Sequence, residues 1–147
     1  MYIGLTEEQE ALQREVREYY AELLTPETRA ELAGGGGVGP AMRRVVRQMG
    51  DDGWLGVGWP TEWGGRGFTP VEQFLWFDEA MRAGAPVPML TINTVGPTIM
   101  RFGSDEQKEF FLPKILKGEI HFCIGCSETG AGIDLAALRT RADRDGD

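Results

Sequence analysis

The sequence predicts a mainly α-helical domain followed by the first strands of a truncated β-domain. From Leu5 to Lys117 the apolar residues recur at three- and four-residue steps, the period of an amphipathic helix. Several segments in this part also begin with residues typical of helix N-termini. After Gly118 comes a short apolar run, Ile120 to Cys126, which is typical of a β-strand. We therefore expect an all-α domain over residues 1–118 and the beginning of a β-domain over residues 119–147.

The length and charge of the chain restrict its class. With 147 residues, of which 41% are hydrophobic, the chain can bury the core of one domain but not of two. The formal net charge of -8 argues against a nucleic-acid or anionic-membrane partner, because both require a basic surface. No stretch reaches the roughly 18 apolar residues of a membrane span. The first residues lack the basic and apolar regions of a signal peptide, so we expect a cytoplasmic protein.

The first helix is predicted from a capping box. Thr6-Glu7-Glu8-Gln9 pairs a hydroxyl with a carboxamide three residues later, as at a helix N-terminus. Leu12, Val16 and Leu23 follow at helical spacing. Pro26 should end or redirect this helix, because proline cannot donate a backbone hydrogen bond.

The next segments are a glycine loop, a second helix and a tryptophan-rich loop. The glycines from Gly34 to Gly39 are not followed by Lys-Ser/Thr, which excludes a nucleotide-binding P-loop. A helix should follow Pro40 and end near Gly50 or Gly53. Three tryptophans stand among many glycines between Trp54 and Gly67. We expect an irregular loop there whose aromatic rings pack back on the helices.

Two further helix starts are predicted, with an interrupted segment between them. Thr69-Pro70-Val71-Glu72 combines a cap, a proline in the first turn and a capping glutamate, and its helix should run to about Gly84. The apolar segment from Met89 to Phe102 is interrupted by Gly96-Pro97, which should kink or restart it. Ser104-Asp105-Glu106-Gln107 is another capping box. Its helix should bend at Pro113 and end at Gly118.

The predicted strand ends in Ser127-Glu128-Thr129-Gly130-Ala131-Gly132. Such a turn can present consecutive backbone N–H groups to an anionic or carbonyl-rich ligand, although an ordinary tight turn also accounts for two glycines. Further on, Asp145-Gly146 indicates a hairpin turn. The aspartates Asp143, Asp145 and Asp147 resemble the start of a calcium loop, but the glycine is one position early and no glutamate follows. Because the returning strand is missing, we expect the chain to be a fragment of a longer protein.

Two cysteines and one histidine also lie in the predicted strand. Cys123 and Cys126 have C-x-x-C spacing, but at a period of two their side chains point to opposite faces of a strand. This argues against a redox pair or a zinc site, so we interpret both as small packing residues. His121, the single histidine, precedes Phe122 and is interpreted as structural.

Four stretches, in this order, resemble the N-terminal part of the acyl-CoA dehydrogenases, the flavin enzymes that desaturate acyl-CoA thioesters. They are Leu5–Gln9, Gly58–Gly67, Phe102–Lys108 with the following Leu112-Pro113, and Ser127–Asp134. The resemblance covers essentially the whole chain. It implies an all-α N-terminal domain of the acyl-CoA dehydrogenase type that ends near Gly118, the start of a middle β-barrel domain, and a C-terminal helical domain absent from this sequence.

The resemblance also implies FAD as cofactor and assigns residues to its site. Backbone groups of Ile124, Cys126 and Ser127, with the Ser127 hydroxyl, would contact the flavin. Gly132 and Ile133 would approach the pyrophosphate and the acyl-CoA substrate. The apolar segment from about Asn93 to Met100 would lie near the acyl tail, although core packing also accounts for any single residue of it. Amides aimed at the flavin pyrimidine edge would stabilise the charge that develops when hydride arrives.

The family's catalytic base is a glutamate that usually lies in the C-terminal domain, so no catalytic residue is assigned in this chain. We interpret Glu128 as a turn-stabilising residue and Glu62 as fixing its loop by accepting backbone hydrogen bonds. No metal site is expected. The resemblance implies electron transfer to an electron-transfer flavoprotein and assembly as a homo- or hetero-tetramer.

Two departures from the family pattern matter. Proline is frequent where Thr129 stands, and serine or threonine where Ile133 stands. Ile133 cannot donate a side-chain hydrogen bond, which leaves a second hypothesis open, a non-catalytic subunit of a mixed oligomer. A third hypothesis, outside the family, is a small helical binding module with an apolar groove.

Overall fold

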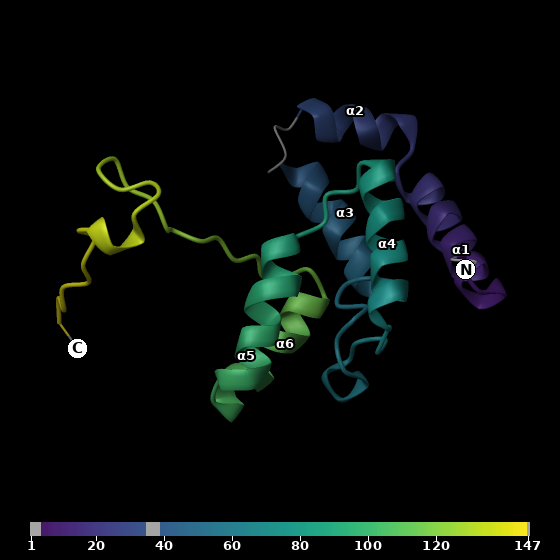
Figure 1. Ribbon diagram of the computed structural model, residues 1–147. Coiled ribbons are helices and arrows are strands. Elements are labelled where there is room, and N and C mark those ends of the chain that lie inside the picture. The colour runs from purple at the N-terminus through teal and green to yellow at the C-terminus, as the bar shows by residue number, and fades with distance from the viewer. Residues whose placement is uncertain (1–3, 35–38, 147) are drawn as a thin grey trace.

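A computed structural model describes residues 4–34 and 39–146 of the chain, and these residues are mainly α-helical (Figure 1). The mainly helical architecture expected from the sequence is therefore confirmed. The helices are α1 (Glu7–Leu23), α2 (Pro26–Gly34), α3 (Pro40–Asp51), α4 (Pro70–Ala83), α5 (Gly96–Phe102) and α6 (Asp105–Leu116), with the short helical turns η1 (Thr61–Trp63), η2 (Thr91–Val95) and η3 (Leu135–Ala137).

All three predicted capping boxes are present. The hydroxyls of Thr6, Thr69 and Ser104 each accept a hydrogen bond from the backbone N–H three residues later. The side-chain oxygen at that later position accepts a hydrogen bond from the backbone N–H of the cap residue in each case. Each cap satisfies amides that a helix N-terminus leaves without partners, a contribution of about 1 kcal/mol.

Prolines and glycines set several helix ends as expected. Pro26 redirects the chain, since it begins α2 instead of only ending α1. Gly84 and Gly118 adopt left-handed conformations, with φ of 72° and 64°, directly after α4 and after the end of α6. α6 continues through Pro113 to Leu116. Most of the predicted glycine loop, residues 35–38, lies outside the described residues.

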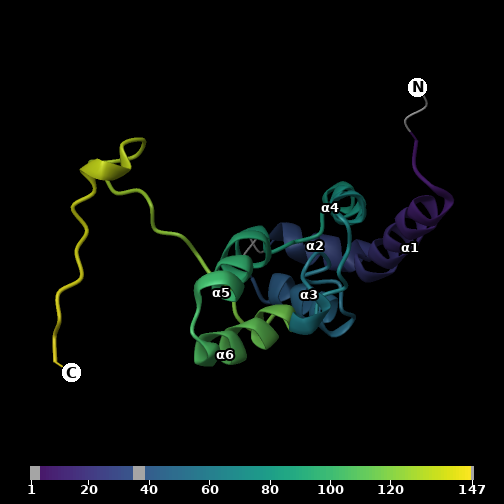
Figure 2. The same cartoon turned by 60° about the horizontal axis from the view of Figure 1, so that its bottom comes forward.

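One hydrophobic core joins the helices and the tryptophan-rich loop. α1 packs along α4, and α5 packs against α6 (Figures 1 and 2). The predicted packing of the tryptophan-rich loop is confirmed, because Trp54 and Trp59 are buried and Trp63 packs against the core. The buried core side chains include Val16, Tyr20, Val45, Val46, Met49, Trp54, Trp59, Trp76, Ile92, Leu112 and Ile115.

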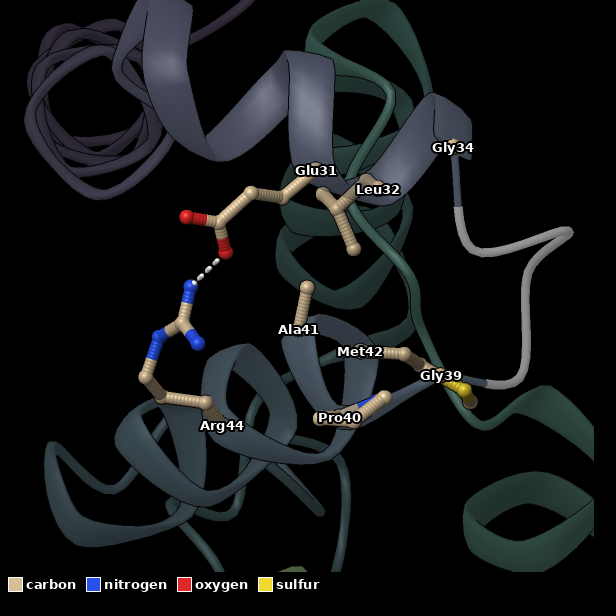
Figure 3. A pocket seen from close by; sticks show the side chains of 8 residues that line it. All are labelled: Glu31, Leu32, Gly34, Gly39, Pro40, Ala41, Met42 and Arg44. Carbon is tan, nitrogen blue, oxygen red and sulfur yellow. Dashed lines mark hydrogen bonds and ion pairs between the residues drawn. The ribbon is translucent and has the colours of Figure 1, made fainter.

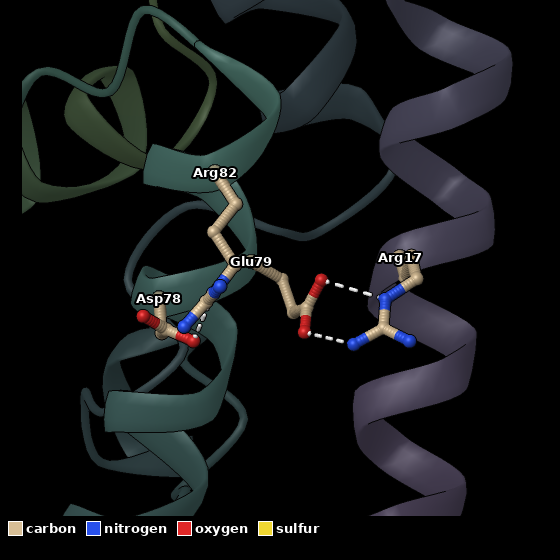
Figure 4. Close-up of polar contacts among 4 residues, drawn as sticks. All are labelled: Arg17, Asp78, Glu79 and Arg82. Atoms are coloured by element: carbon tan, nitrogen blue, oxygen red, sulfur yellow. Dashed lines mark hydrogen bonds and ion pairs between the residues drawn. The ribbon is translucent and has the colours of Figure 1, made fainter.

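An ion pair holds α1 against α4. Arg17 donates through Nε and Nη2 to the two carboxylate oxygens of Glu79, at 3.0 and 2.6 Å (Figure 4). The Glu79 side chain is only 4% exposed, whereas Arg17 remains largely in solvent. The hydrogen bond from Arg17 lowers the pKa of Glu79, and the same bond raises the pKa of Arg17. On the outer side of α4, Arg82 donates to Asp78 at 2.7 Å (Figure 4).

The strand predicted over 120–126 does not form. Residues 119–127 have no regular secondary structure, and the only β-pairing in the described part of the chain is an isolated antiparallel bridge between Glu128 and Ala131. A β-strand is stabilised by hydrogen bonds to a neighbouring strand, and none of the described residues provides that neighbour. Residues 139–146 form no hairpin either, and the predicted turn extends to Asp147, outside the described residues.

The interpretation of the two cysteines as packing residues is wrong for this structure. Cys123 and Cys126 are both exposed, and neither forms a disulfide. That interpretation relied on a strand that buries one of its faces. Without a paired strand, both side chains project into solvent. His121 is exposed too, although partial burial, with a further contribution from Arg43, lowers its pKa.

Candidate functional site

A widened helical turn, η2, lies where the sequence predicts an interruption before α5. In η2 the N–H of Gly96 donates to the carbonyl of Thr91, five residues back, instead of to that of Ile92. Pro97 follows and has no N–H to donate to the turn. The carbonyl of Ile92 is thereby left available for another donor. The predicted break is confirmed, and it takes the form of a π-helical turn.

The indole of Trp59 uses this free carbonyl. Its Nε1 donates to the Ile92 carbonyl oxygen at 2.7 Å, and both residues are nearly fully buried. The indole also lies directly on Gly96, where a Cβ atom would be 2.0 Å from Trp59 Cζ2. Only glycine permits this contact, because carbon atoms normally approach to about 3.5 Å. The tryptophan-rich loop is therefore locked onto η2.

The η2 turn also holds the chain that leaves the helical domain. The backbone N–H of Phe122 donates to Thr91 Oγ1 at 3.0 Å, and Thr91 is 2% exposed. The Phe122 ring packs near that of Phe111 on α6, with 5.6 Å between ring centroids. Among the described residues, this is the only hydrogen bond between residues 120–146 and the helices. Beyond Phe122 the chain runs away from α5 and α6 in both views (Figures 1 and 2).

Glu128 organises the turn that follows. Its backbone exchanges two hydrogen bonds of 3.0 Å with Ala131. Its carboxylate accepts hydrogen bonds from the backbone N–H groups of Arg139 and Thr140 and from the Thr140 hydroxyl, at 2.6 to 3.0 Å. The bond from the Thr140 hydroxyl contributes most to lowering the pKa of Glu128. The interpretation of Glu128 as a turn-stabilising residue is confirmed.

The residues predicted to bind the cofactor share one exposed segment, 124–133. Ile124 is 67% exposed, Ile133 is fully exposed, and Cys126, Ser127 and Gly132 are also exposed. Among the described residues, the backbone N–H groups of residues 123–127 have no hydrogen-bond partner. Added Cβ atoms at the three glycines 125, 130 and 132 would meet nothing within 4 Å. Open amides of this kind fit an anionic or carbonyl-rich ligand such as a flavin.

Asn93, the predicted acyl-tail residue, lies apart from that segment. It belongs to η2, next to Thr91, and its exposed side chain accepts a hydrogen bond from Gln73 Nε2 at 3.5 Å. Its amide nitrogen donates to the Met89 sulfur at 3.6 Å. The structure therefore groups the cofactor candidates with one another. Within the described part of the chain, the one hydrogen bond that links them to the Asn93 turn is that from Phe122 to Thr91.

The interpretation of Glu62 as a hydrogen-bond acceptor for its loop is wrong. Glu62 is exposed and takes part in no hydrogen bond among the described residues. Arg66 holds the loop instead, by donating to the carbonyls of Gly53 at 2.8 Å and Asp52 at 3.1 Å. The Arg66 guanidinium also stacks 3.7 Å from the centre of the Trp54 ring.

Two cavities of the helical part contain none of the predicted site residues. The larger, about 610 Å³, lies between the end of α3, the tryptophan-rich loop and α6, with an apolar floor of Leu55, Trp63, Leu112 and Leu116. The smaller, about 330 Å³, lies between α2 and α3 beside the ion pair of Glu31 and Arg44 (Figure 3).

The described residues contain no cluster of three metal-ligating side chains, and none of their helices is long and apolar enough to cross a membrane.

Sequence reasoning did not find Thr91, and it predicted that Trp59 packs on the helices but not its hydrogen bond to the Ile92 carbonyl. The one local signal near them is the break at Gly96-Pro97, which indicates an irregular helix but not what stabilises it. Trp59 is 33 residues away from its hydrogen-bond acceptor and Phe122 is 31 residues away from Thr91. Contacts at such separations leave no pattern in a single sequence.

Comparison with known proteins gives consistent matches over the chain. The family described as "Acyl-CoA dehydrogenase, N-terminal domain" matches residues 6–119. Acyl-CoA dehydrogenase FadE26 of Mycobacterium tuberculosis is 57% identical over all of this chain. A structure of the ChsE4–ChsE5 complex from the same organism superposes with a TM-score of 0.91 at 56% identity, again over the whole chain. A second structure, the Tcur3481–Tcur3483 steroid ACAD, gives a TM-score of 0.91 at 49% identity and 100% coverage.

These relatives are longer proteins. The chain spans 38% of the length of FadE26 and 38% of each matched chain in the two structures. The similarity therefore concerns the helical part and the segment directly after it.

Proposed function

Because the chain belongs to the acyl-CoA dehydrogenase family, we propose that the whole protein is an FAD-dependent oxidoreductase that introduces an α,β double bond into an acyl-CoA thioester. The observation that carries this proposal is the family match over residues 6–119, next to an exposed segment whose backbone amides at 123–127 have no hydrogen-bond partner among the described residues. The helical domain ends near Gly118, and the residues after it begin the middle β-domain.

In this proposal the 124–133 segment forms one rim of the flavin site. FAD supplies the acceptor for the hydride that leaves the substrate. Backbone groups of Ile124, Cys126 and Ser127, with the Ser127 hydroxyl, bind the pyrimidine edge of the flavin. Fixed N–H groups at that edge stabilise negative charge without having to reorient during the reaction. Gly132 and Ile133 approach the pyrophosphate and the acyl-CoA, and their open surroundings support this assignment.

Proton removal is assigned to a residue outside this chain. Glu128, the one carboxylate of the 124–133 segment, has its oxygens engaged by Arg139 and Thr140, and its pKa is lowered, which makes it a poor base. The 147-residue chain alone therefore should not turn over substrate. In the whole protein, electrons pass from the flavin to an electron-transfer flavoprotein, and the enzyme is a cytoplasmic homo- or hetero-tetramer.

The relatives suggest which acyl groups to test first. One matched structure is described as a steroid ACAD, and we extend this description to the present protein as part of the proposal. The substrate is then a CoA thioester on a steroid side chain. The acyl contact is assigned to the region of Asn93, whose side chain is exposed on η2.

A non-catalytic role within a mixed oligomer is the second candidate. It is favoured by Ile133, which is fully exposed and lacks the hydroxyl expected at that position by resemblance to the family. One matched structure is a complex of two differently named proteins, ChsE4 and ChsE5. A helical binding module outside the family is no longer needed, since the family match covers the helical domain.

The test is anaerobic reduction of the bound flavin in the whole protein. A panel of acyl-CoA thioesters with straight-chain, branched, aromatic and steroid side-chain groups is added, and flavin absorbance is followed. We expect bleaching, fastest with a steroid side-chain thioester. A protein that binds FAD but is reduced by none of these thioesters would contradict the dehydrogenase assignment. Faster bleaching by a straight-chain thioester would contradict only the steroid assignment.

A further inference from the structure

We propose that Thr91 is a positioning residue that fixes the point from which the flavin-binding segment leaves the helical domain. This inference rests on the proposed function, because it concerns how the 124–133 segment is presented to FAD. Among the described residues, Thr91 makes no hydrogen bond to residues 124–133, and its side chain bonds the backbone of Phe122. It acts through the backbone of that one residue.

Residues 120–146 are joined to the helices by one hydrogen bond among the described residues, from the Phe122 N–H to Thr91 Oγ1 at 3.0 Å. The Phe111 ring supports it from the side by packing near the Phe122 ring. Ile124, two residues further on, is already 67% exposed. Among the described residues, Phe122 is therefore the point at which the segment is attached to the helical domain.

The residue that accepts this bond, Thr91, is held in place by its neighbours. Thr91 is 2% exposed, and its carbonyl accepts the hydrogen bond from the Gly96 N–H, five residues on, that defines the π-helical turn. The neighbouring Ile92 carbonyl is held by the buried indole of Trp59, which Gly96 allows to pack closely. Because both of these carbonyls of the turn are hydrogen-bonded, the Thr91 side chain is held in one position, and its hydroxyl can act as a fixed acceptor.

The bond between Phe122 and Thr91 should affect the affinity for FAD. Without this bond, the backbone at Phe122 would be held less firmly on the helical domain, and a smaller fraction of molecules would present the 124–133 amides to the cofactor. Apparent affinity falls in proportion to the fraction of molecules in the competent arrangement. The bond links a partly buried amide to a buried hydroxyl, and the loss of such a bond changes an equilibrium by about three- to tenfold.

The experiment uses the whole protein, stripped of flavin and titrated with FAD. Thr91→Val removes the acceptor with little change of volume, and we expect it to weaken FAD binding by about three- to tenfold. Thr91→Ser keeps the hydroxyl and should restore affinity to within about twofold. Thr61→Val is the matched control, since Thr61 is exposed and its hydroxyl makes no hydrogen bond among the described residues. It should bind FAD as the wild type does.

A second pair of variants tests the same bond from the other side, in case Thr91→Val does not fold. Phe122→Ala and Phe122→Pro both remove the ring, but only proline also removes the N–H donor. Phe122→Pro should bind FAD about three- to tenfold more weakly than Phe122→Ala. Equal affinities in this pair, or an unchanged affinity in folded Thr91→Val, would overturn the proposal.

Hydrogen exchange separates this inference from the proposed function. The Phe122 amide should exchange about three- to tenfold faster in Thr91→Val than in the wild type, with or without FAD. If the wild type takes up no FAD although its Phe122 amide is protected, the proposed function fails while the contact stands. If that amide is as poorly protected in the wild type as in Thr91→Val, the positioning role is wrong.

Discussion

Replacing Gly96 with alanine should test the packing that fixes η2. The new Cβ would lie 2.0 Å from Trp59 Cζ2 and 2.5 Å from Cη2. A normal carbon–carbon contact is about 3.5 Å or more, so the buried indole must move by roughly 1.5 Å. Overpacking of this kind costs about 1–3 kcal/mol. The displaced indole would also lose its hydrogen bond to the Ile92 carbonyl, worth about 1 kcal/mol.

Part of this loss is offset, because alanine is better than glycine in a helix by about 1 kcal/mol at most. We therefore expect Gly96→Ala to lower the free energy of unfolding by about 2 kcal/mol. The measurement is urea unfolding of the 147-residue chain, followed by tryptophan fluorescence and far-UV circular dichroism. Gly34→Ala is the matched control, because nothing lies within 4 Å of a Cβ at that helix end. If Gly96→Ala unfolded within about 0.5 kcal/mol of the wild type, the packing account of η2 would be refuted.

Three further substitutions test other parts of the account. Glu79→Gln should cost about 2 kcal/mol at pH 7, because it removes a buried charged acceptor of Arg17. The pKa of Glu79 is lowered on folding, so this stabilisation is full above the unfolded pKa of 4.5 and is lost as pH falls below it. If urea unfolding gave the same difference in free energy between variant and wild type down to pH 3, this prediction would be contradicted. Glu128→Gln should speed hydrogen exchange at the Arg139 and Thr140 amides, which donate to this carboxylate. Acid should do the same to the wild type as pH falls below 4.5, because the pKa of Glu128 is also lowered. Exchange rates that do not depend on pH, once corrected for intrinsic rates, would be inconsistent with a turn held by the carboxylate. Thr69→Ala should lower the free energy of unfolding by about 1 kcal/mol, because α4 loses its N-terminal cap. An equal loss in Thr61→Ala would show that capping is not the cause.

The helix starts could be predicted because their signals are local. The caps at Thr6, Thr69 and Ser104 depend on a side chain three residues away, so the sequence displays both partners together. α2 was not predicted, because none of its residues is fully buried and its apolar spacing is weak. Its start is nevertheless explained by Pro26 at the first helical position.

The errors concern features that depend on distant partners. The run from Ile120 to Cys126 has strand composition, but a strand also needs a neighbour, and the described residues supply none. The interpretation of Cys123 and Cys126 failed for the same reason. The interpretation of Glu62 failed because N–H groups of its loop already donate to carbonyls of the loop, as from Trp63 to Pro60 and from Gly67 to Trp59.

The sequence predicts the turn in the candidate site, but it does not predict how that segment is attached to the helices. The turn after Ser127 and the role of Glu128 follow from residue types and spacing, and the turn is present. The attachment of that segment to the helices depends on Thr91, whose side chain carries no local signal for a contact 31 residues away. The contacts of Ile124, Cys126, Ser127, Gly132, Ile133 and Asn93 with FAD or acyl-CoA stay predictions.

The most direct test of the central claim is the visible absorption spectrum of the whole protein, purified without added flavin. The account predicts a yellow protein with the absorption bands of bound FAD, whose flavin is then reduced anaerobically by an acyl-CoA. A correctly folded protein that is colourless and takes up no added FAD would contradict it. That result would direct attention to Ile133 and to a partner subunit that carries the cofactor.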